Sequence, residues 1–308
     1  MSSWKGQTKG NPLGYRIFIF IIRYFGITAA YLLLRFVSLY FTIFQKKQHQ
    51  VFYFQNVLSQ SKSTIFKNIY KNNYLIGQVL IDKVAALSGM AENFTFDFDG
   101  ENYLREMKEG GFLIGAHMGN WEIAGELLKR LDIKVNILMY ENEKQNIKAL
   151  LDHVQTKKTM NIITIDEDLS HIIAIKKAMD NNELVVIHGD RYVQGSAFIQ
   201  SSLLQKPAKF PYGPYYLVAK FNKPVSFVFA FKETAKHYHF YATKPKLYPR
   251  IKNLMDRKII SAIILNDYIP VLEEKIIKYP HQWFNFFPFW DEEQENEGQD
   301  ILSNKSIS

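Results

Sequence analysis

The feature that most constrains the fold is a regular alternation of short apolar runs with amphipathic helical patterns. Strands that alternate with helices of ten to fifteen residues are typically joined by crossovers into a parallel sheet covered by helices. The alternation therefore predicts an α/β fold with a mostly parallel central sheet flanked by helices. The expected strands are 94–98, 112–114, 135–139, 162–165 and 184–187, and the expected helices are 101–109, 121–131, 143–159 and 168–180.

The rest of the chain extends this pattern without a break between domains. Residues 51–89 are typical of helices rich in Phe, Leu and Ile. Two further strands are expected at 227–231 and 239–243, as an antiparallel pair, before a long helix at 252–278. Because no internal repeat or flexible linker interrupts the pattern, residues 46–290 are predicted to form one domain.

The N-terminus is strongly apolar. Residues 17–22, 24–34 and 36–44 contain almost no polar residue and are separated only by Arg23 and Arg35. No single run reaches the roughly 20 residues of a membrane span. If residues 24–44 crossed the membrane as one helix, Arg35 would lie near the middle of the bilayer, which costs about 2.5–3.5 kcal/mol of insertion free energy. Residues 1–45 are predicted to associate with a membrane, either spanning it or lying in its interface, and no signal peptide is expected. The alternative is an apolar hairpin buried in the protein's own core.

Charge is distributed unevenly along the chain. The net charge is +8, whereas residues 291–308 hold six acidic residues and one lysine, so that residues 1–290 carry +13. A basic body favours contact with anionic lipid or with an acidic protein, and the acidic tail is predicted to be disordered. Lys and Arg are scattered without a recognisable nucleic-acid module, which argues against nucleic acid as a partner.

The chain offers little for metal binding or covalent catalysis. Cysteine is absent, which excludes a disulfide framework and a thiolate metal site. The histidines lack the spacing of metal ligands, so no metal is expected. No serine stands in a Gly-x-Ser-x-Gly elbow either, so a serine nucleophile of that kind is not indicated.

A candidate site lies where the strand at 112–114 gives way to the helix that follows it. His117 is five residues before Glu122, and the two can meet only if the chain turns at Gly119 and Asn120. Glycine and asparagine tolerate such a turn, and Asn120 can also cap the helix. Glu122 could then hold one imidazole nitrogen and leave the other as a base. The plain alternative is a loop histidine and a first-turn glutamate favoured by the helix dipole.

The segment from His117 to Glu122 resembles the His-x4-Asp/Glu signature of the lipid A biosynthesis (late) acyltransferases, a bacterial family. Three further segments match that family in order and approximate spacing, and the resemblance covers roughly residues 14–290. They are Gly189-Asp190-Arg191 after the apolar run 184–187, Pro211-Tyr212-Gly213-Pro214 with the helix and strand that follow, and the aromatic stretch 282–290.

The resemblance implies transfer of a fatty acyl chain from acyl carrier protein to a hydroxyl of a lipid A precursor or similar glycolipid. The expected place is the cytoplasmic face of a bacterial inner membrane, and no cofactor is expected beyond the acylated carrier protein as donor. An amino-acid lipid, a mannoside or a pigment precursor is the alternative acceptor. A catalytically inactive lipid-binding membrane protein is the alternative of a different class.

The resemblance also implies roles for single residues. His117 is the expected general base, held by Glu122, and Arg191 is the expected oxyanion donor or phosphate ligand. His188, two residues from Asp190, is a rival base. Without the resemblance, Asp190 and Arg191 could be an ion pair at a strand end and 211–214 a turn that opens a helix. The residues expected to bind substrate are Asn120, Trp121, Asp190, Tyr212, Gly213 and Pro214.

Overall fold

The computed structural model describes residues 12–86, 90–120, 123, 133–140, 161–165, 169–291 and 293. In this part of the chain seven strands form one sheet in the order β1-β9-β8-β2-β5-β3-β4. The last five strands in that order are parallel, while β9 runs antiparallel to β8 and β1 is parallel to β9. The predicted α/β class with a mostly parallel sheet is confirmed. The strands are β1 Thr95–Asp99, β2 Gly111–Gly115, β3 Val135–Tyr140, β4 Asn161–Ile165, β5 Leu184–His188, β8 Val225–Lys232 and β9 His237–Ala242.

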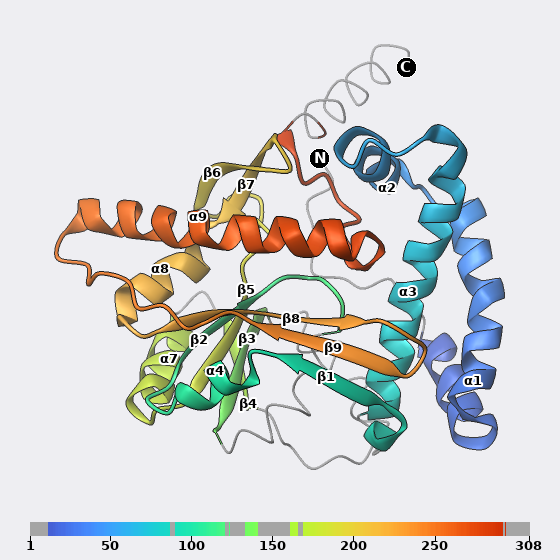
Figure 1. The fold of residues 1–308 in the computed structure, drawn as a ribbon, viewed down its shortest axis with the longest axis horizontal. Coiled ribbons are helices and arrows are strands. Elements are labelled where there is room, and N and C mark those ends of the chain that lie inside the picture. The colour runs from blue at the N-terminus through green and yellow to red at the C-terminus, as the bar shows by residue number, and fades with distance from the viewer. Residues whose placement is uncertain are drawn as a thin grey trace.

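The central strands are buried on both faces, as expected of parallel strands between helices. Phe112 and Ile114 of β2 join a core shared with α7 (Ser170–Asp180), α8 (Tyr212–Phe221) and α9 (Leu254–Lys278). Leu113 points to the other face, where Met107 packs after α4 (Glu101–Glu106). In Figure 1, α9 crosses above the strands with α8 beneath its first half. The predicted antiparallel pair near 227–231 and 239–243 corresponds to β8 and β9.

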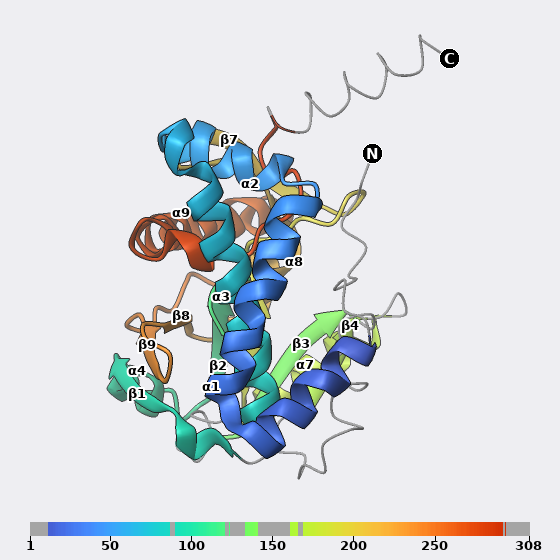
Figure 2. The same ribbon diagram turned by 90° about the vertical axis from the view of Figure 1, so that its right-hand side faces the viewer.

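Helix α1 (Pro12–Phe44) runs beside α3 (Ile65–Ala85) at one edge of the molecule (Figures 1 and 2). Its helical geometry is interrupted at Gly26, where φ is 80°. The two helices approach closely at Gly77, because a Cβ there would come within 2.4 Å of a methyl carbon of Leu34. Only one face of α1 is covered, so the apolar N-terminus does not form a hairpin buried in the core.

The apolar part of α1 is long enough to cross a membrane. It covers Ile17–Phe44, and 28% of its most apolar stretch is buried inside the protein. Its inner face packs through Ile22, Ile27 and Ala30. The outer face exposes large apolar side chains along its whole length, namely Ile17, Phe20, Tyr24, Phe25, Leu32, Phe36, Leu39, Tyr40, Ile43 and Phe44.

A second, two-stranded sheet was not predicted. Strands β6 (Phe198–Leu203) and β7 (Lys206–Pro211) form an antiparallel hairpin. Its tight turn is made by Leu204 and Gln205, both with positive φ. Short elements complete the fold, namely α2 Gln48–Phe52, the π-helix η1 Tyr53–Val57 and the 3-10 helices η2 Lys62–Thr64, η4 Ala91–Asn93 and η6 Pro280–Gln282.

Two predicted helices and most of the tail cannot be compared with the structure. The helical patterns 121–131, apart from Ile123, and 143–159 lie outside the described residues, as do 294–308. The folded part extends beyond residue 290, because Glu293 is buried and pairs with His49 at 2.6 Å.

Candidate functional site

Two side chains from neighbouring parallel strands meet at the carboxyl edge of the sheet. His117 follows β2 by two residues and Asp190 follows β5 by two residues, and Gly115 is aligned with His188 across the strand pair. The His117 Nδ1 atom lies 2.7 Å from Asp190 Oδ1, and the His117 backbone N–H donates to Oδ2 at 3.0 Å. Ligands of open α/β sheets bind at such an edge.

Asp190 is held in its charged form although it is buried. Burial raises the pKa of this carboxyl, but the charge and hydrogen bond of His117, with the charges of Arg191 and His188, outweigh it and hold the pKa well below its usual range. An ionised Asp190 accepts the proton of His117 Nδ1, which assigns the lone pair of the ring to Nε2. The pair therefore has the tautomer that a general base needs.

A second imidazole faces this lone pair. The His188 Nδ1 atom lies 3.2 Å from His117 Nε2, and the two ring centres are 4.2 Å apart. With Nε2 as acceptor, His188 donates through Nδ1. Asp190, His117 and His188 thus form a continuous row of hydrogen bonds.

The turn after His117 depends on glycine and asparagine, as predicted. Gly119 has φ of 60°, and a Cβ at this position would lie 1.8 Å from the carbonyl oxygen of Ala230. Asn120 donates from its backbone to the same oxygen at 2.8 Å, and its side chain accepts from the Ile123 N–H at 3.2 Å in the manner of a helix N-cap. Asn120 is fully buried. Its side chain is used inside the protein, and a contact with substrate stays a prediction.

The aromatic stretch 282–290 lies on the other side of this turn and contacts it. Gly119 N–H donates to the Gln282 carbonyl at 2.9 Å, and Phe284 N–H donates to the His117 carbonyl at 3.2 Å. Between them, the indole N–H of Trp283 donates to Asp190 Oδ2 at 3.3 Å. The resemblance indicated this segment, but nothing in the sequence predicted that it would contact the His117 turn.

Arg191 is anchored by the same segment. Its guanidinium donates to the Phe284 carbonyl at 2.8 Å and lies 5.4 Å from the ring centre of Phe287. It is half-buried beside Asp190, whose negative charge it helps to stabilise. Its predicted role as an oxyanion donor stays a prediction.

Tyr212, Gly213 and Pro214 form the first turn of α8, directly after the hairpin. They connect to the site through the next residue, since the buried Tyr215 hydroxyl donates to the Gly189 carbonyl at 2.7 Å. Tyr268 of α9 acts similarly on β2, donating to the Gly115 carbonyl at 2.9 Å. Sequence reasoning missed both tyrosines, because a single tyrosine in an apolar run carries no signal of its partner.

The remaining predicted site residues cannot be placed. Trp121 and Glu122 lie outside the described residues, so the contact between Glu122 and His117 stays a prediction. In the described part of the chain, no three His, Asp or Glu side chains are grouped as metal ligands would be.

The profile of the family described as "Bacterial lipid A biosynthesis acyltransferase" matches residues 13–292. The chain belongs to this family. It is an acyltransferase that acts on lipids, and the His117–Asp190 pair lies within the matched region. No curated protein matches the chain. Among solved structures, it resembles the 1-acyl-sn-glycerophosphate (LPA) acyltransferase PlsC from Thermotoga maritima at 11% identity, over 79% of this chain and 97% of that one. The TM-score is 0.37, too low to carry a functional argument.

Proposed function

We propose that this acyltransferase moves a fatty acyl chain from the thioester of acyl carrier protein to a hydroxyl of a lipid A precursor or a similar glycolipid. The observation that carries the proposal is the His117–Asp190 pair at the carboxyl edge of the sheet, within a chain of this family. A base of this kind suits the removal of a proton from a hydroxyl, which typically contributes about 10² to 10⁴-fold to the rate.

In the proposed reaction, His117 Nε2 takes the hydroxyl proton as that oxygen attacks the thioester carbonyl carbon. The new C–O bond gives a tetrahedral oxyanion, for which the Arg191 guanidinium and backbone N–H groups are the proposed donors. Collapse breaks the C–S bond, and His117 returns the proton to the departing thiolate of the carrier. Asp190, and Glu122 as expected from the sequence, balance the charge of the imidazolium between these steps.

His188 must move or change partner during this cycle. Its Nδ1 atom faces the His117 nitrogen that receives the proton. We propose that the acceptor hydroxyl takes the place of this contact when the lipid binds. Displacement would make His188 a neighbour of the attacking oxygen, which suits a role in orienting it.

The proposed location is the cytoplasmic face of a bacterial inner membrane, with α1 as the contact. One apolar N-terminal helix suggests membrane association only weakly by itself. Two details support an interfacial position: the inner face of α1 is packed on α3, and Arg23 and Arg35 are exposed beside the apolar outer face. An interfacial helix lets both arginines reach the headgroups.

The test is a transfer assay with acylated carrier protein as donor and a lipid A precursor in vesicles as acceptor. His117→Ala should lower the rate at least about 10²-fold with folding and vesicle binding unchanged. His171→Ala, a histidine of α7 outside the site, is the matched control and should keep its activity. Full activity of His117→Ala would refute the general-base assignment.

The acceptor needs its own experiment. Mass spectrometry of lipids from cells with and without the gene should show one species that loses the mass of one acyl chain. If the species that lacks the acyl chain is a lipid A precursor, the result supports the proposal. If it is an amino-acid lipid, a mannoside or a pigment precursor, that lipid is the acceptor instead.

A further inference from the structure

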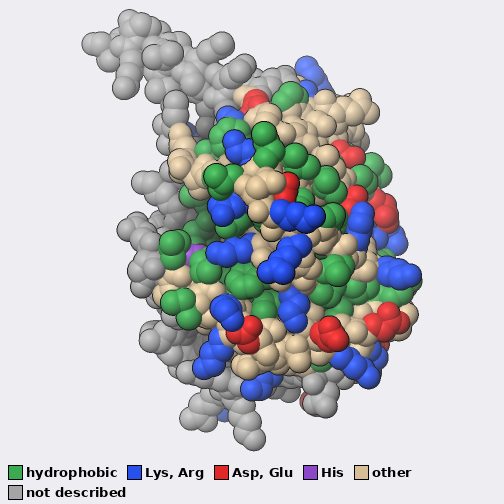
Figure 3. All heavy atoms as spheres, turned by 90° about the vertical axis from the view of Figure 1, so that its left-hand side faces the viewer, with side chains coloured by type: hydrophobic (Ala, Val, Ile, Leu, Met, Phe, Trp, Pro, Cys, Tyr) green, Lys and Arg blue, Asp and Glu red, His purple; other side chains and the backbone are tan. Residues whose placement is uncertain are grey.

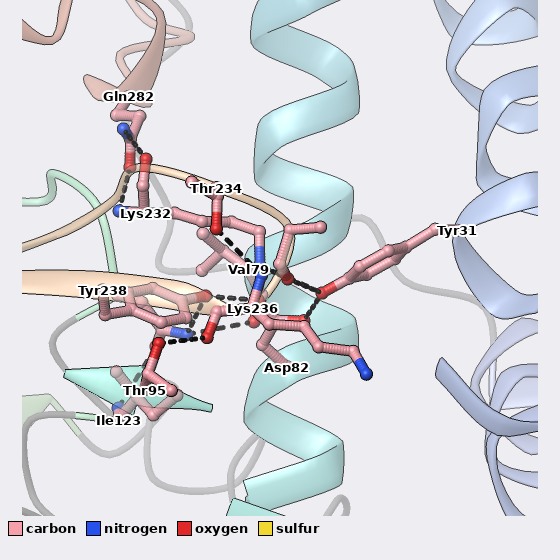
Figure 4. A network of polar contacts seen from close by, with 12 residues as sticks. Tyr31, Val79, Asp82, Thr95, Ile123, Lys232, Thr234, Lys236, Tyr238 and Gln282 are labelled. Carbon is pink, nitrogen blue, oxygen red and sulfur yellow. Dashed lines mark hydrogen bonds and ion pairs between the residues drawn. The ribbon is translucent and has the colours of Figure 1, made fainter. Parts of the chain in front are cut away.

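A buried carboxylate on α3 gathers donors from three other elements (Figure 4). Asp82 is fully buried and accepts from the Lys232 ammonium at 2.5 Å, where β8 ends. It also accepts from the hydroxyl of Tyr31 on α1 and from the hydroxyl of Tyr238 on β9. Lys232 has two further acceptors, the Tyr31 hydroxyl at 3.0 Å and the Ala235 carbonyl at 2.7 Å. Three donors therefore surround the Asp82 carboxylate, and the Lys232 ammonium has three acceptors.

One arm of this cluster leads directly to the His117 turn. Tyr238 gives its only proton to Asp82, so its oxygen accepts from the side-chain N–H of Asn120 at 3.1 Å. That bond, together with a longer one from the same amide nitrogen to the Val79 carbonyl at 3.5 Å, orients the Asn120 side chain with its oxygen toward the Ile123 N–H, from which it accepts at 3.2 Å. Each group in this row has a defined donor and acceptor role. Through Tyr238, Asp82 thereby contributes to the orientation of a side chain three residues from His117.

A second arm reaches the opposite wall of the turn. The backbone N–H of Lys232 donates to Gln282 Oε1 at 2.9 Å, and Gln282 Nε2 donates to the Lys232 carbonyl at 2.8 Å. The Gln282 carbonyl in turn accepts from Gly119 N–H. Both sides of the turn are therefore tied to the residues that surround one buried ion pair.

Stability alone is a weak reason to keep such a pair. Removing two charges from water costs several kcal/mol per ion, and apolar side chains of similar volume are often as stable. The best-attested use of a buried ionic group is to specify one arrangement over others. Here the arrangement specified is that of the segment 117–120 against β8 and Gln282.

We propose that Asp82 and Tyr238 are positioning residues for His117, acting through Asn120. The inference rests on the proposed role of His117 as general base. It assigns to a cluster outside the His117–Asp190 pair the task of holding the imidazole where it meets the acceptor hydroxyl. Tyr31 shares the same carboxylate but leads to α1, away from the turn.

The chain offers closely matched variants for the test. Tyr238→Phe removes the hydroxyl that joins Asp82 to Asn120 and keeps the ring. Tyr31→Phe removes a hydroxyl from the same carboxylate without breaking that row. Tyr248→Phe removes a buried hydroxyl elsewhere, which donates to Asp267 at 2.5 Å. All three can be compared by thermal unfolding and by steady-state kinetics.

Tyr238→Phe should lower kcat about tenfold and leave the KM for acylated carrier protein within about twofold. The reason is that the position of the His117 imidazole is disturbed, whereas binding of the acyl donor is not. Tyr31→Phe and Tyr248→Phe should keep kcat within about twofold at a similar loss of thermal stability. Equal kcat in all three variants would overturn the inference, because the hydroxyl would then be only structural.

A double variant tests whether the effect passes through Asn120. Asn120→Ala and Asn120→Ala with Tyr238→Phe should have the same kcat, whereas multiplication of the two single losses would overturn the proposed route. His117→Ala assayed in parallel separates the two levels of argument. An inactive His117→Ala with fully active Tyr238→Phe rejects only the positioning role, and an active His117→Ala rejects the proposed function itself.

Discussion

At the scale of single residues, the contacts of the site converge on Asp190. Its two oxygens accept from the ring and backbone of His117 and from the indole of Trp283. Because its pKa is held well below the usual range, Asp190 remains charged at neutral and mildly acidic pH. Any acid-induced loss of activity in that range should therefore come from groups other than Asp190.

Trp283→Phe tests the least obvious of these donors. The substitution keeps an aromatic ring and removes the N–H that meets Asp190 at 3.3 Å. A hydrogen bond to a charged group contributes roughly 1.5–3 kcal/mol, so a bond this long should cost about tenfold or less in kcat/KM. Trp290→Phe is the control, since that indole donates to the Leu203 carbonyl outside the site. Equal kinetics for the two variants would remove Trp283 from the positioning of Asp190.

His281 provides a residue-scale prediction of pH dependence. Burial, and secondarily the charge of Lys71, lowers its pKa from 6.5 to about 4. Between those two values the unfolded chain binds a proton that the folded protein does not, so stability falls as pH drops from 6.5 toward 4. His281→Gln can still donate to Asn68 but does not titrate. Denaturant unfolding at several pH values should show a flatter profile for the variant, and identical slopes would contradict the prediction.

At the scale of elements, α1 has two faces with different partners. Its inner face is pinned by the packing of Leu34 and by the hydrogen bond from Asn73 to Thr42 at 2.9 Å. Its outer face leaves Leu32 57% exposed and Phe36 68% exposed, which is unusual for a helix of a soluble domain. The exposed face is the part of the molecule best suited to lipid.

Leu32→Glu with Phe36→Glu should release the protein from vesicles and leave its unfolding temperature almost unchanged, because both side chains are mostly exposed. Co-sedimentation with anionic vesicles measures the binding. Ile173→Glu is the matched control, since Ile173 is 75% exposed on α7 rather than α1. Unchanged binding of the double variant would show that the outer face of α1 is not the lipid contact.

At the scale of the whole molecule, the apolar outer face of α1 and a group of Lys and Arg side chains lie at opposite ends. Helix α1 lies at the right-hand edge in Figure 1, and Lys and Arg side chains gather on the left-hand end, which Figure 3 shows face-on. With α1 in the membrane, the basic end faces away from the lipid. A positive surface of this kind attracts acidic molecules from solution, and the attraction weakens as salt is added.

The absence of cysteine allows a direct test of how the whole molecule sits on the membrane. If α1 lies in the interface of the proposed cytoplasmic face, Ser3→Cys should react with an impermeant maleimide only after spheroplasts are lysed, because both ends of the helix then stay on that side. Ser63→Cys, on the folded domain, is the control for the side that is proposed to face the cytoplasm. Labelling of Ser3→Cys in intact spheroplasts would show instead that the helix spans.

The sequence alone determined the features that depend on neighbouring residues. The periodicity of apolar residues predicted the strands of the main sheet and the long helices, and the pair Gly119–Asn120 predicted the turn after His117. The hairpin β6–β7 escaped prediction because its turn uses Leu204 and Gln205 at positive φ, which such residues seldom adopt.

Only the tertiary structure decided which groups surround His117. Asp190 is 73 positions away in the chain and meets His117 because β2 and β5 are neighbours in the sheet. Trp283 comes from a segment still farther along the chain and contacts Asp190, and Asp82 of α3 connects to Asn120 through Tyr238. Partners of this kind depend on strand order and helix packing, which the pattern of nearby residues does not encode.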